Sequence, residues 1–212
     1  MTPDTPIDLK VNLAGLELDN PVLVASGTFG AGREAAGFIE LSKVGGIIVK
    51  SMTLLPWRGK TTPRMCETPS GMLNAIGIQN KGVDHFLGED LPWLVKQNAT
   101  VVASIAGNTV DEFTKIAEKL RLGGRGVGAV EVNISCPNLE DRNNMFAQSA
   151  DAPAAVTSGV KEAIGRLPVF AKLSPNVTSV TEIATAVVEA GADGLSLINT
   201  VLGMAIDIET RV

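Results

Sequence analysis

The amino-acid sequence predicts an α/β protein built as a (β/α)8 TIM barrel, with about six of the eight βα units present. Short apolar runs alternate with helical patterns through most of the 212 residues. Several of these runs are apolar without strict alternation, as expected of strands buried on both faces of a parallel sheet. Periodicity alone also fits an open doubly wound sheet, but polar residues close the strands, and barrel active sites lie at that end.

Six strands and an N-terminal hairpin follow from the β-rich runs. The stretch LKVNLAGLELDNP is typical of a short hairpin that closes the bottom of a barrel. The expected strands span residues 21–27, 45–51, 100–107, 129–135, 168–174 and 193–200. No linker or low-complexity segment interrupts the chain, so we expect a single domain over residues 1–212 that lacks barrel strands 7 and 8.

Capping patterns mark where the intervening helices begin. Thr109 and Glu112 form a capping-box pattern, in which side chains at the start of a helix bond to its first backbone N–H groups. Ser179 and Glu182 repeat this pattern before the last expected strand. Pro153 suits the first position of a third helix, where its missing N–H is not needed.

One connection between strands is unusually long. Residues 51–81 are rich in Pro, Gly, Thr, Asn and Arg, and loops of this length are usually either functional or disordered. Within the connection, PSGMLNAIGIQNKG interleaves amides with apolar residues and glycines. This composition is suited to wrapping a small polar ligand, so we expect the segment to bind one.

The composition excludes several classes of protein. Hydrophobic residues make up 45% and the net charge is −5, which excludes a disordered chain, and no basic cluster supports nucleic-acid binding. Charged residues are only 19%, which indicates either a partner-subunit surface or a truncated gene. No apolar run reaches the roughly 20 residues of a membrane span, and the start lacks a signal-peptide pattern. These features predict a cytoplasmic protein.

The cysteines predict no metal site and one reactive thiol. Cys66 and Cys136 lie far apart and form neither a disulfide framework nor a zinc motif, so no metal is expected. Cys136 follows an expected strand, and Pro137 prevents that strand from continuing. A thiol, with a reference pKa of about 8.5, becomes a usable base where nearby positive charge or hydrogen bonds favour the thiolate. The alternative for Cys136 is a buried inert cysteine, and Cys66 is interpreted as an ordinary loop residue.

Polar side chains gather at the C-terminal ends of the expected strands, which converge on one mouth in a barrel. Lys50 and Lys172 close apolar runs, and a desolvated ammonium needs an anion or strong acceptors nearby, which favours a functional role. For the serines, the alternative is that strands generally become polar as they reach a loop. The residues at these ends are Ser26, Lys50, Ser51, Ser104, Asn133, Ser135, Cys136, Lys172, Ser174, Asn199 and Thr200.

Six motifs in register resemble one known family. They are NPVLVASGTFG, the KS that ends the second strand, ETPSGMLNAIGIQNKG, EVNISCPN, the lysine of FAKLSPN, and the INT of the sixth strand. Together they are similar to the type 1 dihydroorotate dehydrogenases over about residues 9–200. The segment NAIGIQN resembles the 1B subtype. A cysteine rather than a serine at position 136 argues against type 2.

The resemblance implies an FMN-dependent barrel that oxidises (S)-dihydroorotate to orotate in de novo pyrimidine (UMP) biosynthesis. Cys136 matches the family's catalytic base, which removes the C5 proton while FMN takes the C6 hydride. The 1B subtype implies that electrons pass to NAD through a partner subunit carrying FAD and a 2Fe-2S cluster. It also implies a heterotetramer around a homodimer of this chain. The absence of a metal-binding cysteine pattern here agrees with that division of labour.

The resemblance also implies binding residues. Lys172 matches the lysine that stabilises negative charge near N1 and O2 of the reduced flavin, and Lys50 matches one that touches flavin and substrate. The flavin contacts so implied are Ser26, Lys50, Ser51, Ser104, Asn133, Lys172 and Ile198. The substrate contacts so implied are Lys50, Asn74, Ala75, Ile76, Gly77, Ile78, Asn133, Asn138, Asn199 and Thr200.

Two departures from the family pattern leave alternatives open. Ser104 stands where many 1B sequences have Asn, and the sequence stops before the units that carry the family's FMN-phosphate loops. The alternatives are a type 1A, fumarate-linked dihydroorotate dehydrogenase, a related pyrimidine-reducing FMN barrel, or an inactive fragment. Acceptor specificity separates the enzymes. The nucleotide sequence past Val212 separates an incomplete sequence from a decayed gene.

Overall fold

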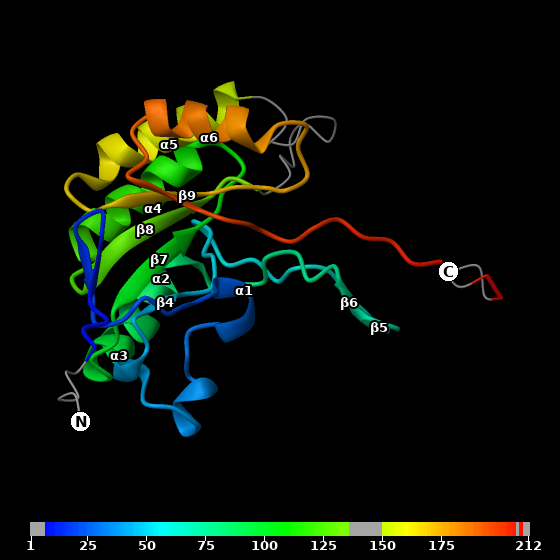
Figure 1. The fold of residues 1–212 in the computed structure, drawn as a ribbon, viewed down its shortest axis with the longest axis horizontal. Coiled ribbons are helices and arrows are strands. Elements are labelled where there is room, and N and C mark those ends of the chain that lie inside the picture. Colours follow the sequence, from blue (N-terminus) through cyan, green and yellow to red (C-terminus); the bar gives the residue numbers. More distant parts are fainter. Residues whose placement is uncertain (1–6, 136–149, 207, 210–212) are drawn as a thin grey trace, which may run out of the picture.

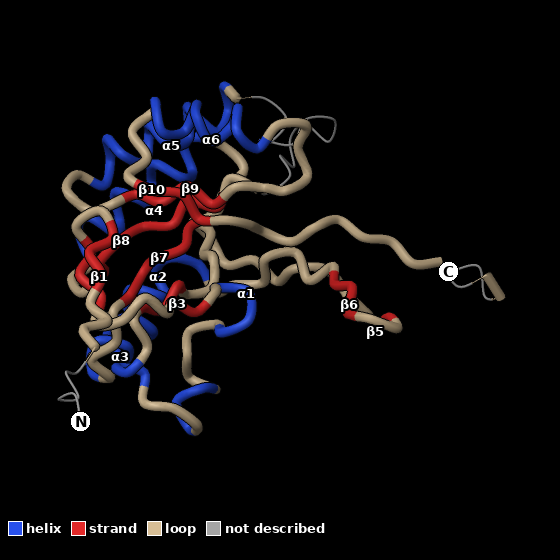
Figure 2. Tube along the Cα trace, viewed as in Figure 1, coloured by secondary structure: helices blue, strands red, loops and turns tan. Residues whose placement is uncertain are grey.

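The computed structural model describes residues 7–135, 150–206 and 208–209. In these ranges six strands form one curved parallel sheet in the order β10-β9-β8-β7-β4-β3 (Figure 1). Helices cover the outer face of this sheet, and a separate hairpin projects away from it (Figure 2). The arrangement is that of six consecutive βα units of a barrel, which confirms the predicted fold class.

The bounds of the elements follow the expected order. The strands are β1 (Val11–Leu13), β2 (Leu16–Leu18), β3 (Leu23–Val24), β4 (Gly46–Ile48), β5 (Met65–Thr68), β6 (Gly71–Asn74), β7 (Val101–Ile105), β8 (Val127–Asn133), β9 (Val169–Lys172) and β10 (Gly194–Ser196). The helices and helical turns are α1 (Ser26–Phe29), η1 (Ala35–Gly37), η2 (Leu41–Lys43), α2 (Gly82–His85), η3 (Phe86–Asp90), α3 (Leu91–Lys96), α4 (Val110–Gly123), α5 (Asp151–Ile164) and α6 (Val180–Glu189).

Three expectations about local structure need correction. The strand expected over residues 21–27 is reduced to β3, because Ser26 begins α1. Pro153 is the third residue of α5 rather than its first, a position that still lies in the first turn and needs no N–H partner. The connection over residues 51–81 contains the antiparallel hairpin β5–β6, so Cys66 is an exposed strand residue rather than a loop residue.

The N-cap hydrogen bonds of the two predicted capping boxes form at the starts of α4 and α6. The Thr109 hydroxyl accepts a hydrogen bond from the N–H of Glu112 at 3.2 Å, and Ser179 does the same for Glu182 at 3.2 Å. The Glu112 carboxylate accepts from the N–H of Asn108 at 2.7 Å, which satisfies a further donor beside the helix start. These local signals therefore specify where both helices begin.

Alternation along the central strands gives the sheet two different faces. On β8, Val130 and Val132 face outward and join the large apolar cluster packed beneath the helices. Ala129 faces inward and packs in a smaller cluster with Leu16 and Leu18 of the β1–β2 hairpin. The hairpin thus covers the inner face near the N-terminal ends of the strands, where the sequence predicted it, and forms an apolar floor.

The residues that precede β3 and β4 approach each other too closely to admit a side chain. A Cβ added at Gly45 would lie 2.0 Å from the backbone oxygen of Asn20. The Asn20 Oδ1 accepts hydrogen bonds from the N–H groups of Val22 and Gly45, each at 3.1 Å. Glycine is therefore required at position 45 by space.

Candidate functional site

A buried polar layer lies on the inner face of the sheet, above the apolar floor. Strand register places Glu131 of β8 beside Ser104 of β7, and Asn133 beside Lys172 of β9. Lys172 in turn is aligned with Ser196 of β10. Because side chains alternate along a strand, Glu131 and Asn133 share the inner face. The layer therefore joins four neighbouring strands near their C-terminal ends.

The Asn133 side chain is held in one orientation at the top of this layer. Its Oδ1 accepts from the backbone N–H of Ser135 at 3.3 Å, from the Ser135 hydroxyl at 2.6 Å, and from Asn199 Nδ2 at 3.1 Å. A backbone N–H can only donate, so the amide oxygen must face Ser135. The Nδ2 group then faces Ser51 and donates to its hydroxyl at 3.2 Å.

A directed chain of hydrogen bonds continues from Ser51 to Glu131. The Ser104 hydroxyl donates to Glu131 Oε1 at 2.9 Å and lies 2.9 Å from the Ser51 hydroxyl. Each hydroxyl has one hydrogen to give, so Ser51 must be the donor to Ser104. The chain therefore runs from Asn133 through two serines and terminates at a carboxylate, which when ionised can accept but not donate.

Lys172 and Glu131 form a buried ion pair. Lys172 is 8% exposed and Glu131 is 1% exposed, and Lys172 Nζ lies 3.7 Å from Glu131 Oε1. The other carboxylate oxygen accepts from the Ser196 hydroxyl at 2.8 Å. The expectation that a buried Lys172 needs an anion nearby is thus met by a residue that the sequence analysis missed. A charged residue inside the apolar run AVEVNIS, two positions before Asn133, was the available signal.

The other expected flavin contacts lie in different settings. Ser26 is buried as the first residue of α1. Lys50 follows β4, and its backbone N–H donates to the carbonyl of Gly30 at 2.9 Å, which fixes the strand end against the loop after α1. Ile198 is exposed in the segment after β10. The structure thus joins Ser51, Ser104, Asn133 and Lys172 in one layer, and it places Ser26, Lys50 and Ile198 on other segments of the chain.

Among the expected substrate residues, Asn199 joins the layer and its neighbour does not. Asn199 donates to Asn133 and to the Ser135 hydroxyl. Its backbone N–H donates to the carbonyl of Leu173 at 3.0 Å, which holds it above β9. Thr200 is exposed, and its N–H donates to the Asn199 Oδ1 at 2.8 Å. An amide from β8 and an amide from beyond β10 are thereby brought into contact.

Residues 74–78 lie apart from the buried layer. Asn74 ends β6 on the hairpin that projects from the sheet (Figure 1). The N–H of Ala75 donates to the carbonyl of Arg64 at 2.8 Å, and the carbonyl of Ile76 accepts from the N–H of Lys60 at 3.0 Å. Gly77 and Ile78 both have positive φ, 74° and 52°. That conformation is strained for a β-branched side chain, and such strain clusters at functional sites.

Asn80 fastens this segment to the sheet, a role that the sequence analysis did not assign. Its Oδ1 accepts from the N–H of Thr53 at 3.1 Å and from the N–H of Gly82 at 2.8 Å. Its Nδ2 donates to the carbonyl of Ile78 at 2.9 Å. Backbone bonds between Asn80 and Trp57, at 2.8 and 2.9 Å, close the base of the long connection. One amide thus fixes the strained end of residues 74–78 beside the residues that follow β4.

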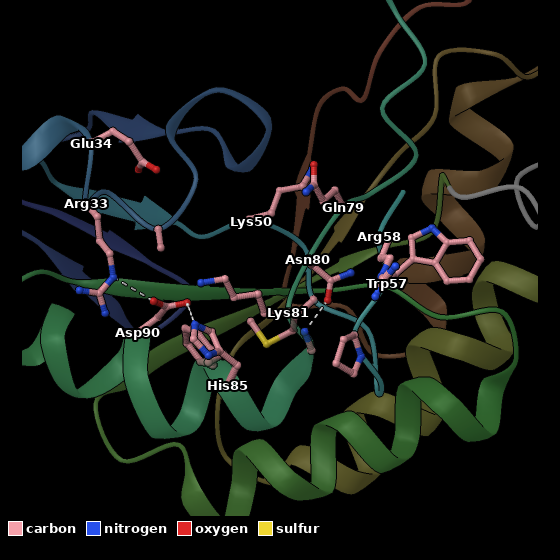
Figure 3. Close-up of a pocket in the computed structure, with 15 residues that line it drawn as sticks. Arg33, Glu34, Lys50, Trp57, Arg58, Gln79, Asn80, Lys81, His85 and Asp90 are labelled. Carbon is pink, nitrogen blue, oxygen red and sulfur yellow. Dashed lines mark hydrogen bonds and ion pairs between the residues drawn. The ribbon is translucent and has the colours of Figure 1, made fainter. Parts of the chain in front are cut away.

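A cavity of about 630 Å³ opens beside Lys50, on the β4 side of the sheet (Figure 3). Three of its charged or ionisable side chains are engaged with one another. Arg33 pairs with Asp90 at 3.1 Å, and His85 Nε2 lies 3.6 Å from the same carboxylate. The Arg33 guanidinium also stacks 4.6 Å from the centre of the Trp93 ring. These contacts fix the positions of the side chains that form the cavity wall near Arg33.

Two expected site residues cannot be placed. Cys136 and Asn138 lie outside the described residues, so their roles stay predictions. Within residues 7–135, 150–206 and 208–209 there is no group of three or more His, Cys, Asp or Glu side chains that could hold a metal ion. In the same ranges, no helix is long and apolar enough to cross a membrane.

The fold and this layer define a β/α-barrel protein with a polar site at the C-terminal ends of its strands. A family model described as dihydroorotate dehydrogenase matches residues 8–212, and the chain belongs to this family. A solved structure of dihydroorotate dehydrogenase from Eimeria tenella, in complex with ferulenol, shares the fold with a TM-score of 0.75 at 21% identity. That likeness covers 97% of this chain and 62% of the other.

Curated relatives are more similar in sequence. A dihydroorotate dehydrogenase B (NAD(+)) catalytic subunit from Alkaliphilus metalliredigens is 45% identical over 207 residues, covering 98% of this chain and 68% of the relative. The protein of the same name from Geotalea uraniireducens is 50% identical over 204 residues, covering 96% of this chain and 66% of the relative. The chain therefore spans about two thirds of the length of these relatives.

Proposed function

We propose that the protein containing this chain oxidises (S)-dihydroorotate to orotate as the catalytic subunit of an NAD-linked dihydroorotate dehydrogenase. The observation that carries the proposal is the similarity to subunits of that name, at 45% and 50% identity over nearly the whole chain. The reaction serves de novo pyrimidine (UMP) synthesis. We place the protein in the cytoplasm, and the six strands within one barrel domain.

The residues of the inner layer fit FMN, the cofactor that this proposal requires. The layer offers a second amide N–H of Asn133 and an ammonium from Lys172, which suits a ring system with several carbonyl and nitrogen acceptors. Gly27 presents open space, since a Cβ there would meet nothing within 4 Å. When bound, FMN supplies the acceptor for the C6 hydride. Lys172 and Ser51 would hold it, together with Ser26, Lys50, Ser104, Asn133 and Ile198.

The chain's own residues would supply proton removal and substrate orientation. The Cys136 thiolate takes the C5 proton and becomes a thiol, as the C6–H bond breaks and the C5=C6 double bond of orotate forms. Its place in the sequence, three residues after the end of β8 and directly before Pro137, supports this role. The amides of Asn133 and Asn199 meet where a flat ring with carbonyl and N–H groups needs both donors and acceptors. Asn74, Asn138, Thr200 and residues 75–78 complete the proposed substrate contacts.

The relatives' names state that they are catalytic subunits, and this supports a partner subunit here. In this proposal the partner carries FAD and a 2Fe-2S cluster, and two copies of the catalytic chain form the centre of a heterotetramer. The assembly delivers the electrons to NAD. A fumarate-linked enzyme would instead use a soluble acceptor without a partner.

Purification of the complete gene product, alone and with its partner subunit, tests the activity. We expect dihydroorotate to bleach the flavin absorbance and NAD to be reduced only when the partner is present. Reduction of fumarate by the catalytic subunit alone would instead identify a 1A-type enzyme. A protein that binds no flavin, or whose flavin is not bleached by dihydroorotate, contradicts the proposal.

The role of Cys136 is tested by removing its thiol. The Cys136→Ala variant is expected to lose at least about 100-fold in the rate of flavin reduction at neutral pH, the lower end of what a general base contributes. The Cys136→Ser variant is expected to regain rate as pH rises, because a hydroxyl is a weaker acid than a thiol. Cys66→Ser serves as the matched control, because Cys66 is exposed on β5. Near-normal flavin reduction in Cys136→Ala at neutral pH would remove Cys136 from the base role.

A further inference from the structure

Glu131 is a buried ionisable group that the proposed reaction does not use. It is 1% exposed and lies on the inner face of β8, two residues before Asn133. Its register neighbour on β9 is Phe170, which belongs to the apolar floor. A carboxylate in such surroundings is strongly destabilising unless its oxygens are satisfied, so its presence calls for a physical account.

Both oxygens of Glu131 are satisfied by groups from three other strands. Oε1 accepts from Ser104 on β7 and faces Lys172 on β9, and Oε2 accepts from Ser196 on β10. The carboxylate thus lies at the centre of the four strands that form the layer. Two hydroxyl donors and one ammonium therefore surround its two oxygens.

The contact with Lys172 is an ion pair rather than a hydrogen bond. At 3.7 Å, Nζ and Oε1 are too far apart for the N–H···O geometry of about 2.7 to 3.2 Å. The carboxylate therefore holds the ammonium by charge from below and offsets part of its positive field. The ammonium does not need to direct an N–H at this carboxylate, which suits a cation that must also face a ligand.

Reduction of a flavin creates negative charge that a nearby cation stabilises. A lone Lys172 would therefore raise the reduction potential of the cofactor, and a paired carboxylate would moderate that rise. We propose that Glu131 is a positioning residue that holds the Lys172 ammonium and, by offsetting its charge, lowers the reduction potential of the bound flavin. The inference rests on the proposed function, because it requires FMN beside Lys172.

The same carboxylate fixes the polarity of the hydroxyl chain. Because Glu131 can only accept while ionised, Ser104 must donate to it, Ser51 must donate to Ser104, and the Ser51 oxygen stays available to Asn133. A neutral amide at position 131 can donate as well as accept, so this direction would no longer be enforced. The charge of Glu131 thus orders the layer as well as the lysine.

The test is the reduction potential of the flavin in the holoenzyme, measured by dye-mediated reductive titration without substrate. Glu131→Gln keeps the size of the side chain and removes its charge. We expect at least a tenfold shift in the two-electron equilibrium toward reduced flavin, about 30 mV upward. An unchanged potential in Glu131→Gln overturns the proposal.

A double-mutant cycle with Lys172→Met tests whether the effect acts through the lysine. We expect Glu131→Gln to change the potential much less in the Lys172→Met background than in the wild type. An equal rise in both backgrounds would mean that the carboxylate acts on the flavin directly, which overturns the positioning role.

Two further variants separate charge from packing. Ser196→Ala removes one hydroxyl donor and no charge, so its potential is expected to stay near that of the wild type, and a shift as large as that of Glu131→Gln overturns the proposal. Glu131→Asp keeps the charge but withdraws it from Lys172, so it is expected to raise the potential by a smaller amount. An unchanged potential in Glu131→Asp counts against the proposal even if Glu131→Gln fails to fold.

The titration distinguishes this inference from the proposed function. If dihydroorotate does not reduce the wild-type flavin, the proposed function fails, whatever the variants show. If wild-type turnover is established and the Glu131 variants keep the wild-type potential, only the positioning role fails.

Discussion

The two faces of the same sheet are built on different principles. On β8, Val130 and Val132 face a large apolar cluster beneath the helices, whereas Glu131 and Asn133 face inward and form hydrogen bonds and an ion pair. The outer face gains its stability from apolar burial, which tolerates exchange between apolar residues of similar volume. The inner face depends on each donor meeting its acceptor. Stability and chemistry are thus assigned to alternate residues of one strand.

The largest expected effect comes from the outer face. Phe113 of α4 is 1% exposed within the large cluster. Phe113→Ala is expected to lower the free energy of unfolding by about 3–5 kcal/mol, because it removes apolar contacts and leaves a cavity. Chemical denaturation measures this loss. We expect the flavin potential of the fraction that remains folded to be unchanged, and a changed potential would show that the two faces are coupled.

Adjacent residues of β8 provide the sharpest test of the comparison. Val132→Ala, on the outer face, is expected to destabilise the fold by about 2 kcal/mol while orotate affinity is retained. Asn133→Ala, on the inner face, removes the partner of Ser51, Ser135 and Asn199 and is expected to weaken orotate binding at least about tenfold, or 1.4 kcal/mol. Calorimetric titration with orotate checks both variants. Equal losses of affinity would contradict the separation of faces.

A smaller effect is expected where the long connection is fastened to the sheet. Asn80→Ala removes the acceptor for the N–H groups of Thr53 and Gly82, and we expect the KM for dihydroorotate to rise about fivefold, equivalent to roughly 1 kcal/mol. Asn80→Asp keeps the acceptor oxygen for both N–H groups and loses the donor to the Ile78 carbonyl and the Thr53 hydroxyl, so its KM should lie between those of the wild type and Asn80→Ala. Steady-state kinetics measures both values. A wild-type KM in Asn80→Ala would show that this amide does not position residues 74–78.

The sequence predicted those features that are encoded locally. The starts of α4 and α6 follow from Thr109 and Ser179, because a capping box is formed by residues within one turn of each other. The order of the strands follows equally from short apolar runs. The start of α5 was misplaced because Pro153 is compatible with several positions in a first turn.

The missed features depend on contacts between distant parts of the chain. Glu131 has its partners on other strands. The register of three neighbouring strands brings Ser104, Lys172 and Ser196 to it. Asn80 acts by joining Thr53 to Ile78, a contact that requires the connection to fold back on itself. Pairings of this kind follow from the register of the sheet and the path of the loop, which periodicity does not determine.

The close contact at Gly45 has a consequence for which substitutions the sheet can tolerate. β3 is paired to β4 by only two residues, so their alignment depends on the tight approach between Asn20 and Gly45. Any side chain at position 45 would push the segment before β3 away from β4. The missing Cβ of one glycine therefore keeps two neighbouring strands of the sheet in register.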